Sequence, residues 1–480
     1  MKEPSANMEK SALKESFITC CTSQGIELRA TMLRLTRYEA VFEIYNPACV
    51  LLSSEVLSEF KILLQDRTVY SGRASIKHLV NTGPTLVCEA TLEDFWLDGD
   101  FFSGLNQGLK LRDQCAEFFR EWQKLYRVVP EYKLIIADMQ SFFMELRLWL
   151  NQVELGIRST PSGDRLQLEH DVIKDLEQPI IPIITGLFER FEAVAEGIEA
   201  GLRPAHMSYM KRQLHPLVLC SPFAYRTYSK PLGFAGDYEM VNMIARDPYE
   251  GSSLFAKVVN LGFLLQPPVR AHRNRIDYLV QRLFEESVRV SGAGRAARVF
   301  SLACGPAIEI QRFLVEKEIS ERADLTLLDF NEEALQHTSA KLGEIKAKFK
   351  RSTPVRFIKK SVHQILKEAG KSVERSPEKQ YDFIYCTGLF DYVSDQVCRR
   401  LMTTLYHWLA PGGLLLATNV DRSNPLRTGM AHLLDWNLIY RTSRQAQELR
   451  PEAVAPEDFS VKSDLTGVNL FLAARKPNHA

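Results

Sequence analysis

The sequence lacks any cysteine pattern that holds a metal or a disulfide framework. Nine cysteines are scattered along 480 residues, and no two are spaced as C-x-x-C. A disulfide-rich secreted scaffold and a structural zinc site are therefore excluded, because both need closely and regularly spaced cysteines. Dispersed thiols are typical of a protein in the reducing cytoplasm, so we expect a cytoplasmic protein with no bound metal.

Long apolar runs and an excess of charge are also missing. The longest apolar windows, such as PIIPIITGLF at 179–188, are shorter than the roughly 20 residues of a membrane-spanning helix. The first residues, MKEPSANMEKSALKES, contain no apolar core of a signal peptide. A formal net charge of +1 provides no electrostatic attraction for nucleic acid. We expect neither a nucleic-acid partner nor an integral membrane segment.

The patterns that are present indicate several domains, because 480 residues are too many for one compact core. Residues 1–15 are predicted to be a disordered leader. Short β-branched stretches between turn residues predict a small β-barrel at 16–95. Amphipathic runs predict a helical linker and substrate cap at 96–290, with breaks at 159–164 and at the proline pair near Pro179. A further domain is expected at 291–480.

The last part alternates strands with helices. The strands that we expect are RVFSLA, DLTLLDF, PVRFIKK, YDFIYC, GGLLLATN, DFSVKSD and NLFLAAR. This alternation predicts an α/β fold with a Rossmann-like, mostly parallel sheet of seven strands. Ligands of such sheets bind beyond the carboxyl ends of the strands.

The first of these strands ends in a turn that favours a ligand. In VFSLACGPAIEIQRFL, at 299–314, an apolar strand stops at Cys-Gly-Pro and a helix follows, with Glu309 in its first turn. A dinucleotide needs three spaced glycines for its pyrophosphate, and here Gly305 stands alone. S-adenosylmethionine has no phosphates and tolerates such a turn. Asp329 ends the next strand, where an acid accepts both ribose hydroxyls of an adenosyl ligand.

With YDFIYCTGLFDYVSD and LAPGGLLLATN, this pattern makes the segment from Arg298 to Lys476 resemble the class I S-adenosylmethionine-dependent methyltransferases, although their usual G-x-G-x-G loop is degenerate here. The resemblance implies an enzyme with S-adenosylmethionine as its cofactor. The residues expected to bind the cofactor are Ala303, Cys304, Gly305, Glu309, Asp329, Phe330, Ser361, Val362, Thr387, Gly388 and Asp237.

Three further strings carry a narrower resemblance. SPFAYRTYSKPLGFAGDYEMVNMI at 221–244, AHRNRIDYL at 271–279 and LDWNLIYRT at 434–442 resemble the bacterial methyltransferase family for biosynthesis of 3-hydroxypalmitic acid methyl ester, an extracellular quorum signal. The resemblance implies methyl transfer to the carboxylate of a 3-hydroxy fatty acid or a similar lipid acid. A carboxylate, with a pKa of about 4, needs no general base.

Such an acceptor needs a cationic or hydroxyl clamp, and the first string also reads as a loop that folds over a site. Tyr238, with Asp237 and Glu239, is expected to close over the methionine end of the cofactor. The candidates for the catalytic clamp are Arg226, Tyr228, Lys230, Arg273 and Arg275. A different small-molecule acceptor, an amine or a hydroxyl, would instead need a base, and His272 or Tyr238 would have to serve.

The N-terminal β segment weakly resembles a PilZ-type barrel, a module that binds cyclic di-GMP. Arg29 and Arg34 are five apart rather than four, and the second PilZ motif is absent. We therefore expect a degenerate barrel that serves packing, a homodimer or an unidentified ligand, without cyclic di-GMP. A third hypothesis is a regulatory protein in which a methyltransferase fold no longer turns over.

Overall fold

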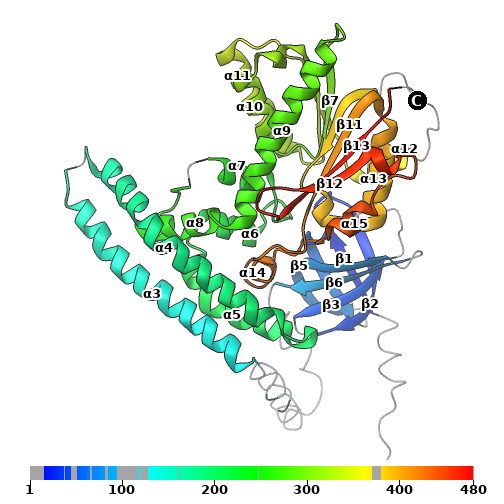
Figure 1. Ribbon diagram of the computed structural model, residues 1–480. Helices are drawn as coiled ribbons and strands as arrows, with labels where there is room; N and C mark the ends of the chain where they lie inside the picture. The colour runs from blue at the N-terminus through cyan, green and yellow to red at the C-terminus, as the bar shows by residue number, and fades with distance from the viewer. Residues whose placement is uncertain are drawn as a thin grey trace, which may run out of the picture.

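The computed structural model describes residues 16–36, 38–44, 51–64, 67–81, 85–93, 116, 119, 128–161, 163–246, 248–369 and 380–478. Figure 1 shows a β-barrel, a long helical arm and an α/β part. The leader predicted at 1–15 lies outside the described residues, and so does nearly all of the first part of the predicted helical linker, up to residue 127.

The N-terminal part is a closed barrel of six antiparallel strands. The strand order is β1-β2-β3-β6-β5-β4, and pairing of β1 with β4 closes it. Its strands are β1 (Ser16–Cys21), β2 (Glu27–Leu35), β3 (Glu39–Ile44), β4 (Val56–Leu64), β5 (Arg67–Asn81) and β6 (Leu86–Leu92). Along β2, buried Leu28, Ala30 and Met32 alternate with exposed residues, because side chains of a strand point to opposite faces. The predicted β-barrel is confirmed.

Helices connect the barrel to the α/β part. They are α3 (Pro130–Arg158), α4 (Arg165–Glu196), α5 (Arg203–Val218), α6 (Pro222–Ser229), α7 (Tyr238–Ala245), α8 (Leu254–Leu264) and α9 (Pro267–Ser291), with a short 3-10 turn at Ala200–Leu202. The helices α3 and α4 form the arm in Figure 1, which packs through a core that includes Tyr132, Ile184 and Phe191.

One predicted helix break is found and the other is wrong. The chain turns between α3 and α4, as expected for 159–164, whereas α4 continues through Pro179 and Pro182. Each proline removes one backbone donor from the helix. Packing of α4 against α3 and α8 outweighs that loss, because the turns around the prolines bury Ile180 and Ile184.

The C-terminal part is a seven-stranded sheet in the order β12-β13-β11-β10-β7-β8-β9. The strands are β7 (Ala297–Leu302), β8 (Ala323–Asp329), β9 (Val355–Lys359), β10 (Tyr381–Cys386), β11 (Leu409–Val420), β12 (Phe459–Ser463) and β13 (Asn469–Arg475). All neighbours are parallel except those of β13. The predicted seven-stranded α/β fold is confirmed.

Helices cover both faces of the sheet and complete the core. Those of this part are α10 (Ile308–Glu316), α11 (Glu332–Phe349), α12 (Val362–Ala369), α13 (Asp395–His407), α14 (Arg427–Leu434) and α15 (Ser443–Gln447), with short 3-10 turns at Glu318–Arg322, Phe390–Tyr392 and Pro456–Asp458. The order of strands reverses between β7 and β10, and a crevice forms at such a switch point beyond the strand ends.

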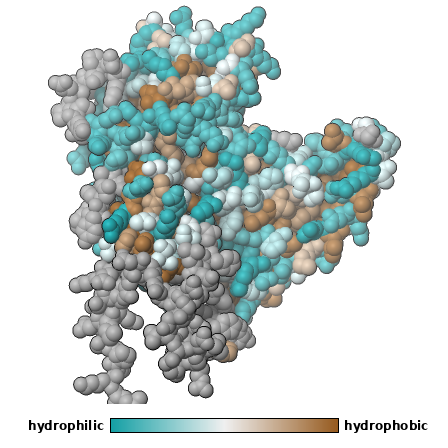
Figure 2. Space-filling view, turned by 180° about the vertical axis from the view of Figure 1, so that it is seen from behind, coloured by the Kyte–Doolittle hydropathy of each residue, from teal (hydrophilic) through white to brown (hydrophobic). Residues whose placement is uncertain are grey.

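The surface of the arm carries apolar side chains, which form brown patches in Figure 2. On α3, Leu148, Trp149 and Leu155 are among the exposed residues. None of the helices that the structure describes is long and apolar enough to cross a bilayer. A homodimer stays a prediction.

Candidate active site

The turn after β7 has a backbone that brings main-chain groups close to a ligand. Ala303, Gly305 and Ala307 all have positive φ, at 57°, 51° and 48°. For an alanine this conformation costs on the order of 1 kcal/mol, so the surrounding contacts must hold it. The Cys304 N–H donates to the Leu328 carbonyl at 3.0 Å. A Cβ on Gly305 would meet no atom within 4 Å, so its free face is open to a ligand.

Asp329 ties this turn to the end of β8. Its carboxylate accepts the Gly305 N–H on Oδ2 and the Asn331 N–H on Oδ1, both at 3.0 Å. Burial raises the pKa of Asp329, which is only 6% exposed. Because each carboxylate oxygen has two lone pairs, both oxygens retain capacity for a ligand hydroxyl. The turn and the acid therefore fit the adenosyl group that the sequence predicts.

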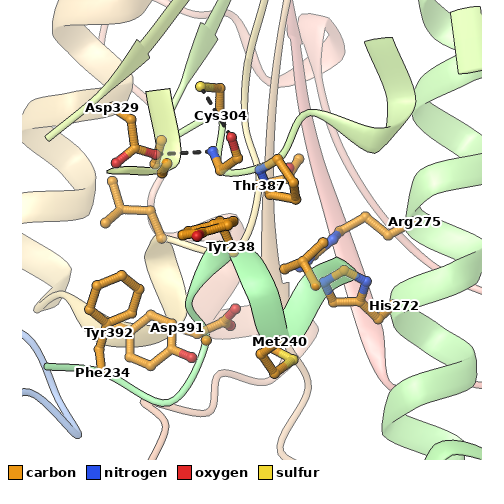
Figure 3. Close-up of a pocket in the computed structure, with 18 of the residues that line it drawn as sticks. Phe234, Tyr238, Met240, His272, Arg275, Cys304, Asp329, Thr387, Asp391 and Tyr392 are labelled. Atoms are coloured by element: carbon orange, nitrogen blue, oxygen red, sulfur yellow. Dashed lines mark hydrogen bonds between the residues drawn. The ribbon is translucent and has the colours of Figure 1, made fainter. Parts of the chain in front are cut away.

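A cavity of about 190 Å³ opens beside this corner. In Figure 3, Asp329 and Cys304 lie at the edge of the sheet, Arg275 and His272 reach in from α9, and Tyr392 lies across from them. The predicted residues that line it are Tyr238, His272, Arg275, Ala303, Cys304, Gly305, Glu309, Asp329, Phe330, Val362, Thr387 and Gly388. Most of the rest of the wall is apolar.

Arg275 brings a positive charge into this cavity. Its residue is 9% exposed, and its guanidinium lies over Gly388, where a Cβ would be 3.4 Å from Nη1. Among the described residues no hydrogen bond or ion pair reaches it. Burial lowers the pKa of Arg275 while Asp391 and Glu309 raise it, and a guanidinium stays charged in proteins. A buried, unpaired cation is costly, which favours an anionic ligand as its partner.

The two acids near Arg275 are already bonded within the protein. The Tyr385 hydroxyl donates to Glu309 at 2.8 Å, and the Val420 N–H donates to Asp391 at 2.6 Å. Burial raises the pKa of both acids and so shifts them towards the uncharged form. Neither acid neutralises Arg275 by direct contact.

The chain was compared with known proteins. Residues 270–450 match the sequence model of a family described as a methyltransferase domain, and this segment contains the turn, Asp329 and the first five strands of the sheet. Residues 270–450 are therefore a methyltransferase domain. No curated protein matches it.

Solved structures are also similar to this methyltransferase, at low sequence identity. A Bordetella parapertussis protein described as a possible exported protein is 17% identical, with 61% of this chain and 95% of that chain covered and a TM-score of 0.39. Magnesium protoporphyrin IX methyltransferase from Synechocystis is 10% identical, with 56% of this chain and 99% of that chain covered and a TM-score of 0.33. The N-methyltransferase NodS from Bradyrhizobium japonicum is 14% identical, with 52% of this chain and 99% of that chain covered and a TM-score of 0.30.

Several residues expected in the methyltransferase site point elsewhere. Arg226 pairs with buried Asp237, whose carboxylate caps α7 by accepting the Met240 N–H. Arg273 donates to the carbonyls of Ile244 and Leu264. These side chains join helices next to the cavity and do not line it.

The other outlying candidates have structural contacts too. Tyr228 packs on the His215 ring, and Lys230 donates to Ser75 and to the Asp435 carbonyl. Ser361 directly precedes α12, whose first residue, Val362, does line the cavity. Glu239 pairs with Arg246.

The cavity also contains residues that the sequence did not single out. Asp391 and Tyr392 follow β10, and the Trp436 indole donates to the Tyr392 hydroxyl at 3.0 Å. Asp391 and Tyr392 lie in the string TGLFDYVSD, and Trp436 lies in LDWNLIYRT. In the sequence these strings indicated only a family resemblance, and no role was predicted for the three residues. Phe234 packs against Phe330, with ring centroids 5.6 Å apart. No feature of the sequence marks Leu52, a residue of the barrel that also lines the cavity.

Proposed function

We propose that this methyltransferase methylates the carboxylate of a lipid acid, such as a 3-hydroxy fatty acid. The cofactor supplies an activated methyl group. The chain has to hold the acceptor carboxylate beside that group and keep water away, and no residue has to remove a proton from a carboxylate. The observation that carries the proposal is Arg275, a buried cation that lines the cavity and has no hydrogen-bond or ion-pair partner among the described residues.

The three strings that resemble the 3-hydroxypalmitic acid methyl ester family meet in this cavity, which supports the proposal. The first contributes Phe234 and Tyr238, the second His272 and Arg275, and the third Trp436. Segments that lie far apart in the sequence thus surround one space. The resemblance itself suggests the acceptor, and the convergence suggests that the shared strings serve it.

A second, apolar cavity adjoins the first and suits a hydrocarbon group. It has a volume of about 50 Å³, and Pro268, Val269, Met430 and Trp436 line both cavities. Its other walls are Phe188, Phe223, Phe263, Gln266, Leu426, Gly429, Leu433 and Leu434. Since a cavity of about 150 Å³ holds benzene, this space holds about two carbon atoms. It fits part of an alkyl chain whose carboxylate lies at Arg275.

The decisive experiment is calorimetric titration of the protein saturated with S-adenosylhomocysteine. The ligands are 3-hydroxy fatty acids of short to long chain and their primary amides, which have no charge. We expect the acids to bind more tightly than the amides and to yield methyl esters, detected by mass spectrometry. In Arg275→Gln, acid affinity should fall about 10- to 100-fold, as when a hydrogen bond to a charged group is lost.

Arg270→Gln is the matched control, because Arg270 lies on the same helix with an exposed side chain outside the cavity. It should bind acid and S-adenosylhomocysteine like the wild type. Loss of S-adenosylhomocysteine binding in Arg275→Gln would instead assign Arg275 to the carboxylate of the cofactor and overturn its role as acceptor clamp. Equal binding of acid and amide would contradict a carboxylate acceptor.

An amine or hydroxyl acceptor is the second candidate, and His272 favours it. His272 lies in the cavity wall, and its buried Nδ1 has no hydrogen-bond partner among the described residues. Burial lowers the pKa of His272 well below its ordinary value, so the ring is neutral, and the low pKa makes it a weak base that serves only by close contact with the acceptor. Formation of a methylated amine or ether in place of an ester would identify this reaction.

We propose that the barrel is a PilZ-like domain that does not bind cyclic di-GMP, because the second PilZ motif is absent. For the cell, we propose a cytoplasmic location, because the nine cysteines are scattered and show no spacing of a disulfide framework. Titration with cyclic di-GMP should show no binding heat.

A further inference from the structure

Two turns of the barrel reach the methyl-transfer cavity, one through Gln24 and the other through Leu52. Leu51 and Leu52 are adjacent in the sequence and both are buried, at 3% and 5% exposed, yet they belong to different cores. Leu51 belongs to the core of the barrel, whereas Leu52 belongs to the core of the α/β part, with Phe390 and Tyr392 of the 3-10 turn after β10, and lines the cavity. The turn that ends at Val56 is therefore shared by both parts.

A buried acid shapes this turn. Glu55 is fully buried, and its carboxylate accepts the Leu52 N–H at 2.8 Å and both the N–H and the hydroxyl of Ser23, at 2.9 and 2.6 Å. Ser54 has a φ of 61°, a conformation that needs support. The Glu55 contacts connect the two barrel turns nearest the cavity, since Gln24 also lines it.

The turn bonds to three segments that form the cavity wall. The Ser53 N–H donates to the Tyr392 carbonyl at 2.8 Å, and the Ser54 hydroxyl donates to the Asn437 carbonyl at 2.7 Å. The Val56 N–H donates to the Gly233 carbonyl at 2.5 Å. Each of these partners lies next to, or is, a residue that lines the cavity.

The approach at the third segment is close. Gly233 has a φ of 90°, and a Cβ there would lie 2.7 Å from the Ser23 Cβ. Only a glycine fits between the two parts without a shift of the backbone. In Figure 1 the barrel strands lie directly below the part of the sheet that carries α15, consistent with this contact.

We propose that the barrel is a positioning module of the methyltransferase: its Leu51–Val56 turn, held by Glu55, sets the acceptor side of the cavity through Leu52. The cofactor corner at Ala303–Ala307 and Asp329 has its own hydrogen bonds and needs no contact from the turn. Loss of the turn should therefore impair acceptor binding and spare the cofactor. The inference rests on methyl transfer and is independent of the acceptor's chemical class.

Leu52→Ala and Leu51→Ala are the test, since they make the same change in adjacent residues that face different cores. For Leu52→Ala we expect the KM for the acceptor substrate to rise at least 10-fold. The affinity for S-adenosylhomocysteine should stay within 3-fold of the wild type. Leu52→Met should recover most of the loss. Leu51→Ala should keep the wild-type KM; if it fails to fold, Leu51→Val and Leu52→Val replace the pair. Equal increases of KM in both variants, or a parallel loss of cofactor affinity, would overturn the proposal.

A second measurement needs no acceptor, so it separates this proposal from the one on lipid acids. Hydrogen exchange is followed in the S-adenosylhomocysteine complex of wild type and Glu55→Gln. The amides of Tyr392, Trp436 and Ile439, which are bonded within the wall segments, should exchange faster in the variant. The amides of Cys304 and Gly305 should be unchanged. If Glu55→Gln changed the exchange rates of both groups of amides equally, or of neither, the turn would not position the wall.

Discussion

At the scale of single residues, the site depends on buried charges whose partners are incomplete. The Asp329 carboxylate accepts hydrogen bonds from two backbone N–H groups. The buried Arg275 guanidinium makes no hydrogen bond to the described residues. Burial makes each group costly unless a ligand adds the missing contacts. In the proposed function, Asp329 accepts from hydroxyl groups of the cofactor, and Arg275 binds the anionic acceptor.

The first prediction concerns Asp329. Asp329→Ala should weaken S-adenosylhomocysteine binding by roughly 1 to 3 kcal/mol, because hydrogen bonds to a charged group are lost. Calorimetric titration measures this change. Asp324→Ala, at the start of the same strand and paired with Arg356 at the surface, is the control and should bind normally. Unchanged affinity in a folded Asp329→Ala protein would place the cofactor elsewhere.

At the scale of elements, α14 joins the arm to the cavity. Met430 and Leu433 of this helix line the apolar cavity, while His432 is buried against α3, with Nδ1 3.1 Å from the Tyr132 hydroxyl. Burial lowers the pKa of His432 from 6.5 to about 3. The helix is thus anchored by a neutral histidine in an apolar core.

This anchor predicts a dependence of stability on pH. The folded pKa of His432 lies below the unfolded value, so its stabilisation is complete above about pH 6.5 and is lost as the pH falls towards 3. In that range the wild type should lose up to about 1.4 kcal/mol per pH unit more than His432→Gln. Urea unfolding of both proteins at pH 7 and pH 5 measures the difference. Equal losses of unfolding free energy in the two proteins would show that the pKa of His432 is not lowered in the folded state.

At the scale of the whole molecule, the barrel, the connecting helices and the C-terminal part meet at Asp435. This residue is 3% exposed, and its carboxylate accepts from Lys211 of α5 at 2.5 Å. Lys230, 1% exposed, donates to the Asp435 carbonyl and to Ser75 of the barrel. Burial raises the pKa of Asp435, but Lys211 and Lys230 outweigh it, and the pKa is lowered.

Asp435→Asn should therefore destabilise the fold by about 3–5 kcal/mol, because it leaves ammonium groups near the junction without their carboxylate. Asparagine tolerates the left-handed backbone at this position, where φ is 50°, so the change isolates the charge. The free energy of unfolding in urea is the measurement. Glu196→Gln, which removes an exposed partner of Arg427, should cost less than about 1 kcal/mol. Similar losses in both variants would contradict a special role of the junction.

The sequence predicted those parts of the site that depend on local pattern. Gly305 and Asp329 follow directly from two apolar strands, because chain order places consecutive strand ends of a parallel sheet at one edge. The barrel and the seven strands were predictable from alternation and turn residues for the same reason. The continuity of α4 through Pro179 was not predictable, since it depends on packing against other helices.

Only the tertiary structure decided which charges face the cavity. Arg226, Arg273 and Arg275 are equivalent in the sequence, but Asp237 and backbone carbonyls occupy the first two, and the third remains without a partner among the described residues. The place of Leu52 in the cavity wall was likewise decided by docking of the barrel. The sequence by itself determined the fold and the corner formed by Gly305 and Asp329 through short-range order. The rest of the cavity wall depends on contacts between segments hundreds of residues apart, which no local pattern encodes.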